Sequence, residues 1–342
     1  MISRAGDDAL AMRALIVGLG SIGRRHHANL KQIAPDSIIT VWHQHSVPSQ
    51  NAPALEAVDY SVFALEAALE TKPQFAFVTS PATLHVPTAL QLAQHDIHLL
   101  IEKPLSDRLD GVDQLLRECG ERRLALLVGY NYRFSPSLQL LRATLEEGRI
   151  GRVLTIRAEV GQYLPDWRAG VDYRHGVSAR RELGGGVLLE LSHEIDYVRW
   201  LVGEVCEVSA RVAHVSDLDI DVEDTAEIVL GFANGAIGSI HLDMIQRAPI
   251  RTCRVVGSEG TLVWDGLTDQ LRCYSSASHN WTDLWPATKT GRNEMYLAEL
   301  RHFVDCVRGS ATSRVTGEDG RRVLQVALAA RQSSLERRMV SV

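Results

Sequence analysis

The tripeptide Glu102-Lys103-Pro104 places a lysine beside a carboxylate and a rigid proline peptide. It follows the apolar run 97–101, which has the length and composition of a buried strand. Ligands of open α/β sheets bind at the carboxyl ends of the strands. An amino group held there can donate a hydrogen bond or a proton to a bound ligand. The tripeptide therefore indicates a reaction site at one edge of a parallel sheet.

A glycine-rich loop lies upstream in the same pattern. Residues 18–23 read G-x-G-x-x-G, directly after a predicted strand and at the start of a predicted helix. Gly18 permits the tight turn, Gly20 leaves room for a pyrophosphate, and Gly23 lets helix and strand pack closely. The first N–H groups of the helix, from Ser21 and Ile22 onward, suit phosphate oxygens. The loop predicts a bound NAD or NADP.

The second predicted strand bears on the choice between these two cofactors. It ends in Trp42-His43-Gln44-His45-Ser46, with no carboxylate to hold the ribose hydroxyls. A missing acid removes the repulsion that would exclude a 2′-phosphate, and His43 could donate to one. This favours NADP slightly. The alternative is that these are solvated loop residues and that NAD is accepted too.

A third group of chemically capable residues follows a run of three glycines, 184–186. The pattern predicts one helix over residues 187–202, on which Glu190, His193 and Tyr197 share the face opposite an apolar stripe. Histidine titrates near neutrality and can take or return a hydroxyl proton. Lys103 could then stabilise negative charge on the reacting oxygen. The alternative is a solvated polar face.

Further candidates follow other predicted strands. Thr79, Ser80, Pro81 and His85 come after the middle strand, beside the expected nicotinamide ribose, and Glu102 and Pro104 share the edge with Lys103. Candidate substrate contacts are Asn131, Arg133, Tyr197 and the loop residues Tyr163, Trp167 and Arg168. Aromatic faces suit sugar rings, and Arg168 could hold an anionic group. A packed surface loop is the alternative for residues 162–168.

Composition excludes several other classes of protein. The net charge of −6 and the lack of a basic, aromatic-interleaved stretch argue against nucleic acid. The apolar runs fall short of the roughly 18 residues that a membrane span needs. The five dispersed cysteines fit reduced thiols in the cytoplasm. Histidine pairs such as His26-His27 lack companion ligands, so we expect no metal site.

The order of elements predicts two domains of different class. Strands and helices alternate first, which indicates a doubly wound parallel sheet of the α/β class. The expected strands are 14–17, 38–42, 75–79, 97–101 and 124–128, and the expected helices are 22–33, 61–70, 86–93 and 109–122. After Gly151 short alternating strands dominate, with a hairpin signal at Asn234-Gly235. They predict an α+β domain with a large, mostly antiparallel open sheet.

The division we expect has three parts. Residues 1–11 form a disordered extension, with Met12 as an alternative start, 12–130 a Rossmann dinucleotide-binding domain, and 131–342 a substrate and oligomerisation domain. Two helices, 295–308 and 316–337, close the chain and are candidates for packing back on the first domain.

Taken together, the motifs resemble those of the Gfo/Idh/MocA oxidoreductases, which include glucose–fructose oxidoreductase and inositol dehydrogenase. The resemblance rests on the G-x-G-x-x-G loop, Glu102-Lys103-Pro104, the segment Gly129-Tyr130-Asn131-Tyr132-Arg133-Phe134 and the segment GGGVLLELSH, and it covers nearly everything from Met12 onward. It implies hydride transfer between a nicotinamide and a carbon of a sugar, sugar derivative or cyclitol. It also implies that Lys103 contacts substrate and nicotinamide, that His193 is the general acid/base, and that the open sheet forms a homodimer or homotetramer.

One position departs from the family pattern. Many members place an aspartate four residues before the catalytic histidine, whereas here Glu190 lies three residues before His193. We expect this longer carboxylate to orient the imidazole and favour its cation. Three alternatives stay open: a variant that retains its cofactor through an internal redox cycle, a catalytically silent dinucleotide-binding regulator of the same fold, and a scaffold that keeps only the Rossmann fold.

Overall fold

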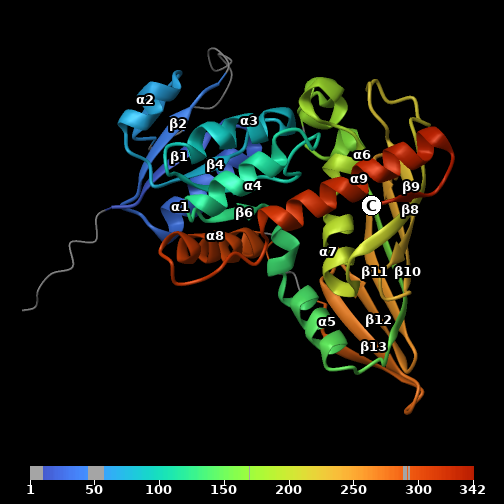
Figure 1. Ribbon diagram of the computed structural model, residues 1–342. Coiled ribbons are helices and arrows are strands. Elements are labelled where there is room, and N and C mark those ends of the chain that lie inside the picture. Colours follow the sequence, from blue (N-terminus) through green and yellow to red (C-terminus); the bar gives the residue numbers. More distant parts are fainter. Residues whose placement is uncertain (1–10, 45–57, 169, 288–290, 292) are drawn as a thin grey trace, which may run out of the picture.

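Two sheets organise the chain, as a computed structural model of the protein shows (Figure 1). The structure describes residues 11–44, 58–168, 170–287, 291 and 293–342. The predicted extension 1–11 lies outside this part except for its last residue, and His45 and Ser46 lie outside it too.

The first sheet is parallel throughout, with strand order β3-β2-β1-β4-β5-β6. Its strands are β1 (Arg13–Val17), β2 (Ile38–Trp42), β3 (Tyr60–Val62), β4 (Phe75–Val78), β5 (His98–Ile101) and β6 (Leu126–Val128). The helices α1 (Ser21–Ile33), α2 (Leu65–Glu70), α3 (Ala82–Ala93) and α4 (Val112–Glu121) connect them. Because helices cover both faces, the inner strands are apolar and almost entirely buried, whereas the edge strand β3 is largely exposed. This is the strand order of a Rossmann fold, so the predicted α/β class is confirmed.

The second sheet has nine strands in the order β14-β13-β12-β11-β7-β10-β9-β8-β15. They are β7 (Val153–Gly161), β8 (Val205–Ala213), β9 (Thr225–Phe232), β10 (Ile237–Asp243), β11 (Ile250–Gly257), β12 (Gly260–Asp265), β13 (Gln270–Ser275), β14 (Asn280–Trp285) and β15 (Val340–Ser341). β7 and β10 pair in parallel and the other neighbours are antiparallel, as expected for a mostly antiparallel sheet.

One face of this sheet packs against helices, and the other is turned away from the rest of the chain (Figure 1). The covering helices are α5 (Pro136–Glu146), α6 (Val187–Glu190), α7 (His193–Val202) and α9 (Gly317–Glu336). On β9 the alternation is plain, since Ile228 and Leu230 are buried while Glu227 and Val229 are exposed. None of the helices in the described ranges is long and apolar enough to cross a membrane.

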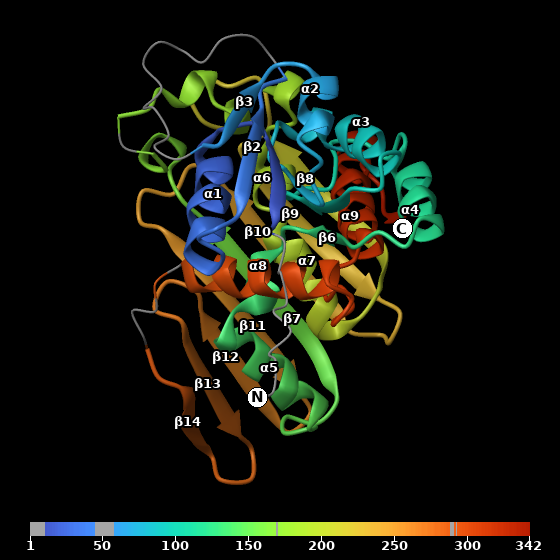
Figure 2. The ribbon, with the colours of Figure 1, turned by 90° about the vertical axis from the view of Figure 1, so that its left-hand side faces the viewer.

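The closing helices α8 (Asn293–Val307) and α9 contact the first domain (Figure 2). The side chains of Asn29 on α1 and Asn293 on α8 exchange hydrogen bonds of 3.3 and 2.8 Å. Gly317 lies so close to β6 that a Cβ there would come within 2.5 Å of Leu126. A capping box at Thr316 and Asp319 starts α9, as its sequence predicts.

Two expected helices differ in the structure. Tyr60–Val62 pairs with β2 as an edge strand, so the expected helix 61–70 begins only at Leu65. The expected helix 187–202 is broken between α6 and α7. The break has a local cause: the Ser192 hydroxyl donates at 2.9 Å to the Leu189 carbonyl, which His193 N–H would use in a continuous helix. The face expected to unite Glu190, His193 and Tyr197 therefore does not exist.

Candidate active site

The glycine loop between β1 and α1 is shaped by close backbone contacts. Gly18 has φ +86°, in the left-handed region that favours glycine. A Cβ on Gly23 would come within 2.3 Å of the Gly18 carbonyl oxygen, so this position also requires glycine. No atom lies within 4 Å of the place where a Cβ of Gly20 would stand. The loop thus leaves open space at the start of α1, where a pyrophosphate would meet unpaired N–H groups.

That open space belongs to a cavity of about 480 Å³. The ends of three neighbouring strands supply most of its wall: Gly18, Gly20 and Ile22 after β1, Thr79, Ser80 and Pro81 after β4, and Glu102, Lys103 and Pro104 after β5. His43 and His85 also line it from the first domain, and Arg168, Val177, Glu190 and Tyr296 reach it from the second. Ser21 and Gly23 belong to the loop but not to the wall. A cavity of this size, walled by the glycine loop and by three strand ends, fits a dinucleotide.

Glu102 is a buried carboxylate that fixes the strand end. Its Oε1 lies 2.7 Å from Nε2 of His26, and its Oε2 accepts the Lys103 N–H at 3.3 Å. His26 in turn stacks on Phe77, with ring centroids 4.9 Å apart. The sequence suggested His26 only as a rejected metal ligand, because the 76 positions between it and Glu102 hide the pair.

Lys103 reaches across to the second domain. Its Nζ donates a 2.7 Å hydrogen bond to the backbone carbonyl of Glu190, the last residue of α6. The Glu190 carboxylate turns elsewhere, because its Oε2 accepts from the Ser178 hydroxyl at 2.8 Å. The expected role of this carboxylate, orienting the imidazole of His193, therefore falls instead to other groups.

His85 holds two strand ends together rather than offering a free imidazole. Nδ1 lies 2.8 Å from the Pro104 carbonyl and Nε2 lies 2.7 Å from the Ser80 carbonyl. Burial lowers the pKa of this buried ring. A neutral ring can donate to only one of the two carbonyls. His85 lines the cavity, but both nitrogens already face backbone.

His193 is the first residue of α7, and two tyrosines hold its ring edge-on. The ring centroids of Tyr130 and Tyr132 lie 5.7 and 5.0 Å away. Nδ1 is enclosed without a hydrogen-bond partner among the described residues, so we assign the exchange of a proton to Nε2. Burial, with Lys103 and Arg251 nearby, holds the pKa of His193 well below 6.5. The imidazole is therefore neutral at pH 7, contrary to the expected cation, and is ready to accept a proton.

A buried ion pair that the sequence did not reveal lies close to His193. Arg251 Nε lies 2.9 Å from Oε1 of Glu194, whose side chain is fully buried. The Arg251 guanidinium stands 4.6 Å over the Tyr132 ring and hydrogen-bonds its hydroxyl. Burial raises the pKa of Glu194 against the pull of Arg251. No motif links a residue of α7 to one of β11, so sequence reasoning had no signal for this pair.

The loop expected to hold substrate lies between two hollows. Arg168 lines the large cavity, while Trp167 lines a second hollow of about 150 Å³ together with Tyr132 and Leu191. The Trp167 Nε1–H donates to the Gln162 carbonyl at 2.9 Å, which fixes the indole. Arg247 covers the Tyr163 ring at 3.5 Å. Trp167 and Arg168 are thus near the expected substrate, and Tyr163 is already stacked.

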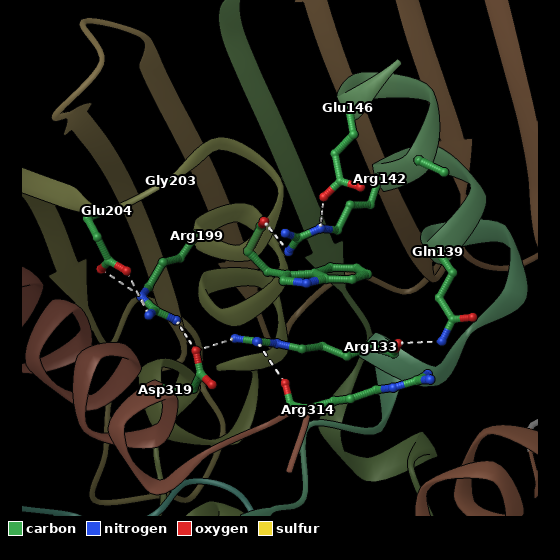
Figure 3. Close-up of a pocket in the computed structure, with 11 residues that line it drawn as sticks. Arg133, Gln139, Arg142, Glu146, Arg199, Gly203, Glu204, Arg314 and Asp319 are labelled. Atoms are coloured by element: carbon green, nitrogen blue, oxygen red, sulfur yellow. Dashed lines mark hydrogen bonds and ion pairs between the residues drawn. The ribbon is translucent and has the colours of Figure 1, made fainter. Parts of the chain in front are cut away.

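Arg133 has a different place from the one expected. Its guanidinium makes a bidentate pair with Asp196 on α7 and also reaches Asp319 on α9 at 3.2 Å. Arg199 approaches Asp319 from the other side at 2.8 Å, as Figure 3 shows. Although burial opposes it, these arginines lower the pKa of Asp319 to about 2. Arg133 therefore ties the end of the first domain to α7 and α9, and the prediction that it contacts substrate is corrected.

Two further substrate candidates are enclosed as well. Tyr197 is fully buried, its hydroxyl 3.4 Å from Glu194 Oε1 and its ring packed against Trp264. Asn131 is also buried, and its Oδ1 has no partner in the described structure. Neither lines the cavity. Tyr197 lies on α7, beyond the break, and therefore does not share a continuous helical face with Glu190 on α6.

The Arg133 network yields a stability prediction. We expect Arg133→Lys to lower the free energy of unfolding by about 1.5–3 kcal/mol, because lysine keeps the charge but loses the bidentate geometry. Chemical denaturation measures the change. Arg174→Lys, in an exposed bidentate pair with Asp172, is the matched control and should cost far less. A raised KM with an unchanged free energy of unfolding would instead show that Arg133 contacts the substrate.

Comparisons with known families match both domains. The oxidoreductase family described as having an NAD-binding Rossmann fold matches residues 12–130. The C-terminal alpha/beta domain of the same Gfo/Idh/MocA family matches residues 142–342. The chain belongs to the Gfo/Idh/MocA oxidoreductase family. The resemblance noted from the motifs is thereby confirmed, as is an NAD-dependent oxidoreductase class.

Relatives in this family include named sugar and cyclitol enzymes. Myo-inositol 2-dehydrogenase of Thermotoga maritima is 28% identical over 97% of this chain and 98% of its own length. Levoglucosan dehydrogenase of Pseudarthrobacter phenanthrenivorans is 26% identical over 78% of this chain and 79% of its own. A solved structure of levoglucosan dehydrogenase with NADH has a TM-score of 0.84 at 22% identity, covering 97% of this chain and 99% of that one. At that identity the structural match shows the shared fold.

Proposed function

We propose that this Gfo/Idh/MocA protein is an NAD(P)-dependent dehydrogenase that transfers a hydride to or from a CH–OH carbon of a sugar, sugar derivative or cyclitol. The observation that carries the proposal is the contact of Lys103 Nζ with the Glu190 carbonyl. It brings the lysine of the cofactor domain to the segment that ends three residues before His193. The activities of the named inositol and levoglucosan relatives support the same class of substrate.

In the proposed reaction the two side chains have separate tasks. When bound, the nicotinamide supplies the hydride chemistry. The neutral His193 accepts the substrate hydroxyl proton at Nε2 during oxidation and returns it during reduction. Lys103 donates a hydrogen bond from Nζ to the reacting oxygen and stabilises the negative charge that develops on it. Tyr130 and Tyr132 keep the imidazole in place and water away from it.

The test begins with binding. Saturating cofactor stabilises a folded protein by RT ln(1 + [L]/Kd), about 2.7 kcal/mol at a hundred times Kd. Melting curves with NAD and NADP in both redox states identify the cofactor, and a sugar and cyclitol panel with that cofactor then reports turnover. A stabilising dinucleotide without turnover of any substrate would favour the silent regulator. No stabilisation by any dinucleotide would remove the proposal's main support.

Within this proposal, the site accepts both NAD and NADP. The sequence after β2 carries no carboxylate in Trp42-His43-Gln44, so a 2′-phosphate meets no repulsion there. Burial lowers the pKa of His43, which supplies hydrogen bonding but little positive charge. The preference for NADP over NAD should therefore be small. Ratios of kcat/KM within about tenfold are expected, and a much larger ratio in either direction would contradict dual use.

The same proposal includes a homodimer or homotetramer through the outer face of the nine-stranded sheet. Val229 and Ile237, on the neighbouring strands β9 and β10, are 51% and 58% exposed there and would be covered by a partner subunit. Ile237→Asp should shift the mass measured by light scattering toward the monomer.

A cytoplasmic location stays a prediction from the dispersed cysteines.

The pKa of His193 predicts the pH profile of oxidation. Since the pKa of His193 in the folded protein lies below 6.5, the imidazole remains deprotonated as the pH falls from 8 to 6.5. The value of kcat/KM for oxidation should therefore fall only below pH 6.5, where protonation of His193 removes the general base. A profile at saturating cofactor, over pH 5–9, measures this limb. A midpoint clearly above 6.5 would show that the imidazole is not held neutral.

A further inference from the structure

The second hollow, of about 150 Å³, lies close to His193, although His193 itself is not part of its wall. The ring of Tyr132 packs edge-on against His193 and also lines this hollow, as does Leu191, two residues before the histidine. The loop that carries Trp167 into its wall carries Arg168 into the wall of the cofactor cavity. A substrate held between Lys103 and His193 could therefore extend one substituent into this hollow.

Most of the wall is apolar. The lining side chains of this kind are Val160, Trp167, Leu191, Pro249, Ile250 and Leu267. A hydroxyl turned toward them would lose its hydration without gaining partners, which is costly. A methyl group gains free energy there, at about 25 cal/mol per Å² of buried apolar surface.

Two polar groups interrupt the apolar wall. The Arg251 guanidinium lines the hollow, while its own Nε is enclosed beside the Glu194 oxygen at 2.9 Å. The Gln162 side-chain amide has no hydrogen-bond partner among the described residues, and its backbone carbonyl accepts from Trp167. Both groups can donate, so the hollow offers donors to an oxygen atom beside a surface that suits a methyl group.

The charges around the hollow favour a neutral acceptor over an anion. Arg251 already faces Glu194, whose side chain is fully buried. A ligand carboxylate at Arg251 would stand beside that second carboxylate, and two like charges on one guanidinium repel each other. An amide carbonyl accepts the same hydrogen bonds and adds no charge.

From this arrangement we infer that the substrate carries a short acylamino substituent, of the acetamido kind, seated in the hollow between Trp167, Gln162 and Arg251. The inference rests on the proposed function and names the class of substrate. Its carbonyl oxygen accepts from Gln162 and Arg251, and its methyl group packs against the apolar wall.

The test compares matched sugars with the cofactor-loaded protein. Calorimetry with saturating reduced cofactor measures binding of glucose, galactose and mannose, of their 2-acetamido derivatives, and of glucuronate and galacturonate. We expect at least one acetamido sugar to bind tenfold or more tightly than both its parent and the uronates. No preference for any acetamido sugar, or a preference for a uronate, overturns the inference.

Two variants locate the effect without touching the buried ion pair. Gln162→Leu removes the amide at similar volume and should reduce the acetamido preference to below threefold, with parent sugars unaffected. Leu267→Trp fills the hollow and should abolish the acetamido preference. Leu335→Trp, at a 79% exposed position on α9, is the control and should retain that preference. An acetamido preference that survives both Gln162→Leu and Leu267→Trp would place the substituent elsewhere. Thermal stabilisation by dinucleotide is measured on the wild type and on each variant. If no dinucleotide stabilises the wild type, the proposed function is wrong. If a dinucleotide stabilises it but no acetamido sugar is preferred, only this inference is wrong.

Discussion

His193→Gln is expected to lower kcat by roughly 10²–10⁴-fold in both directions, the scale of a lost general acid/base. Glutamine retains a polar group of similar reach but cannot take a proton from a hydroxyl. The two tyrosines at 5.0 and 5.7 Å do not depend on a charge at this position, so the variant should fold and bind cofactor. Steady-state kinetics with the best substrate measure the loss.

Two further variants give this result its meaning. His95→Gln, at an exposed position after α3, is the matched control and should leave kcat unchanged. His193→Gly should regain part of its activity in added imidazole, which a merely structural histidine would not show. Wild-type rates in His193→Gln would remove the residue from the mechanism.

Lys103→Ala should lower kcat by roughly 10²–10³-fold, the cost of removing one donor to a developing oxyanion. The structural reason is the position of Nζ, 2.7 Å from the Glu190 carbonyl and in the wall of the cofactor cavity. Because the loop conformation is held by Glu102 and His85, the fold should survive the substitution. Single-turnover measurements of cofactor absorbance separate the hydride step from product release.

Lys72→Ala provides the comparison, since this lysine is exposed and follows α2. Stabilisation by dinucleotide should be retained in both variants. If Lys103→Ala loses cofactor stabilisation as completely as it loses turnover, the lysine serves binding and the proposed role is wrong.

The parts of this fold that could be predicted are those with local causes. Apolar runs, the glycine loop and the Asn234-Gly235 turn each act over a few residues, and they predicted one parallel sheet followed by one mostly antiparallel sheet. The edge strand Tyr60–Val62 was missed because its pairing with β2, not its own pattern, determines its conformation.

The site divides in the same way. The lysine at the end of β5 and the glycine loop were readable because sheet topology alone brings strand ends together. Arg133 was misassigned because its partners Asp196 and Asp319 lie 63 and 186 positions away. Glu190 was misassigned because a single serine hydroxyl breaks the helix, an effect that periodicity does not contain. Arg251 carried no signal, since it is one arginine in an ordinary alternating strand.

The end of α6 at Glu190 determines when the Lys103 side chain loses its conformational entropy. Because the helix stops there, the Glu190 carbonyl is available to the lysine ammonium at 2.7 Å. A lysine side chain gives up about 2 kcal/mol of rotamer freedom when it is fixed in one conformation. Here that loss occurs when the protein folds, before any ligand arrives. The reacting oxygen then has only to replace a carbonyl as the acceptor of an ammonium that is already immobile.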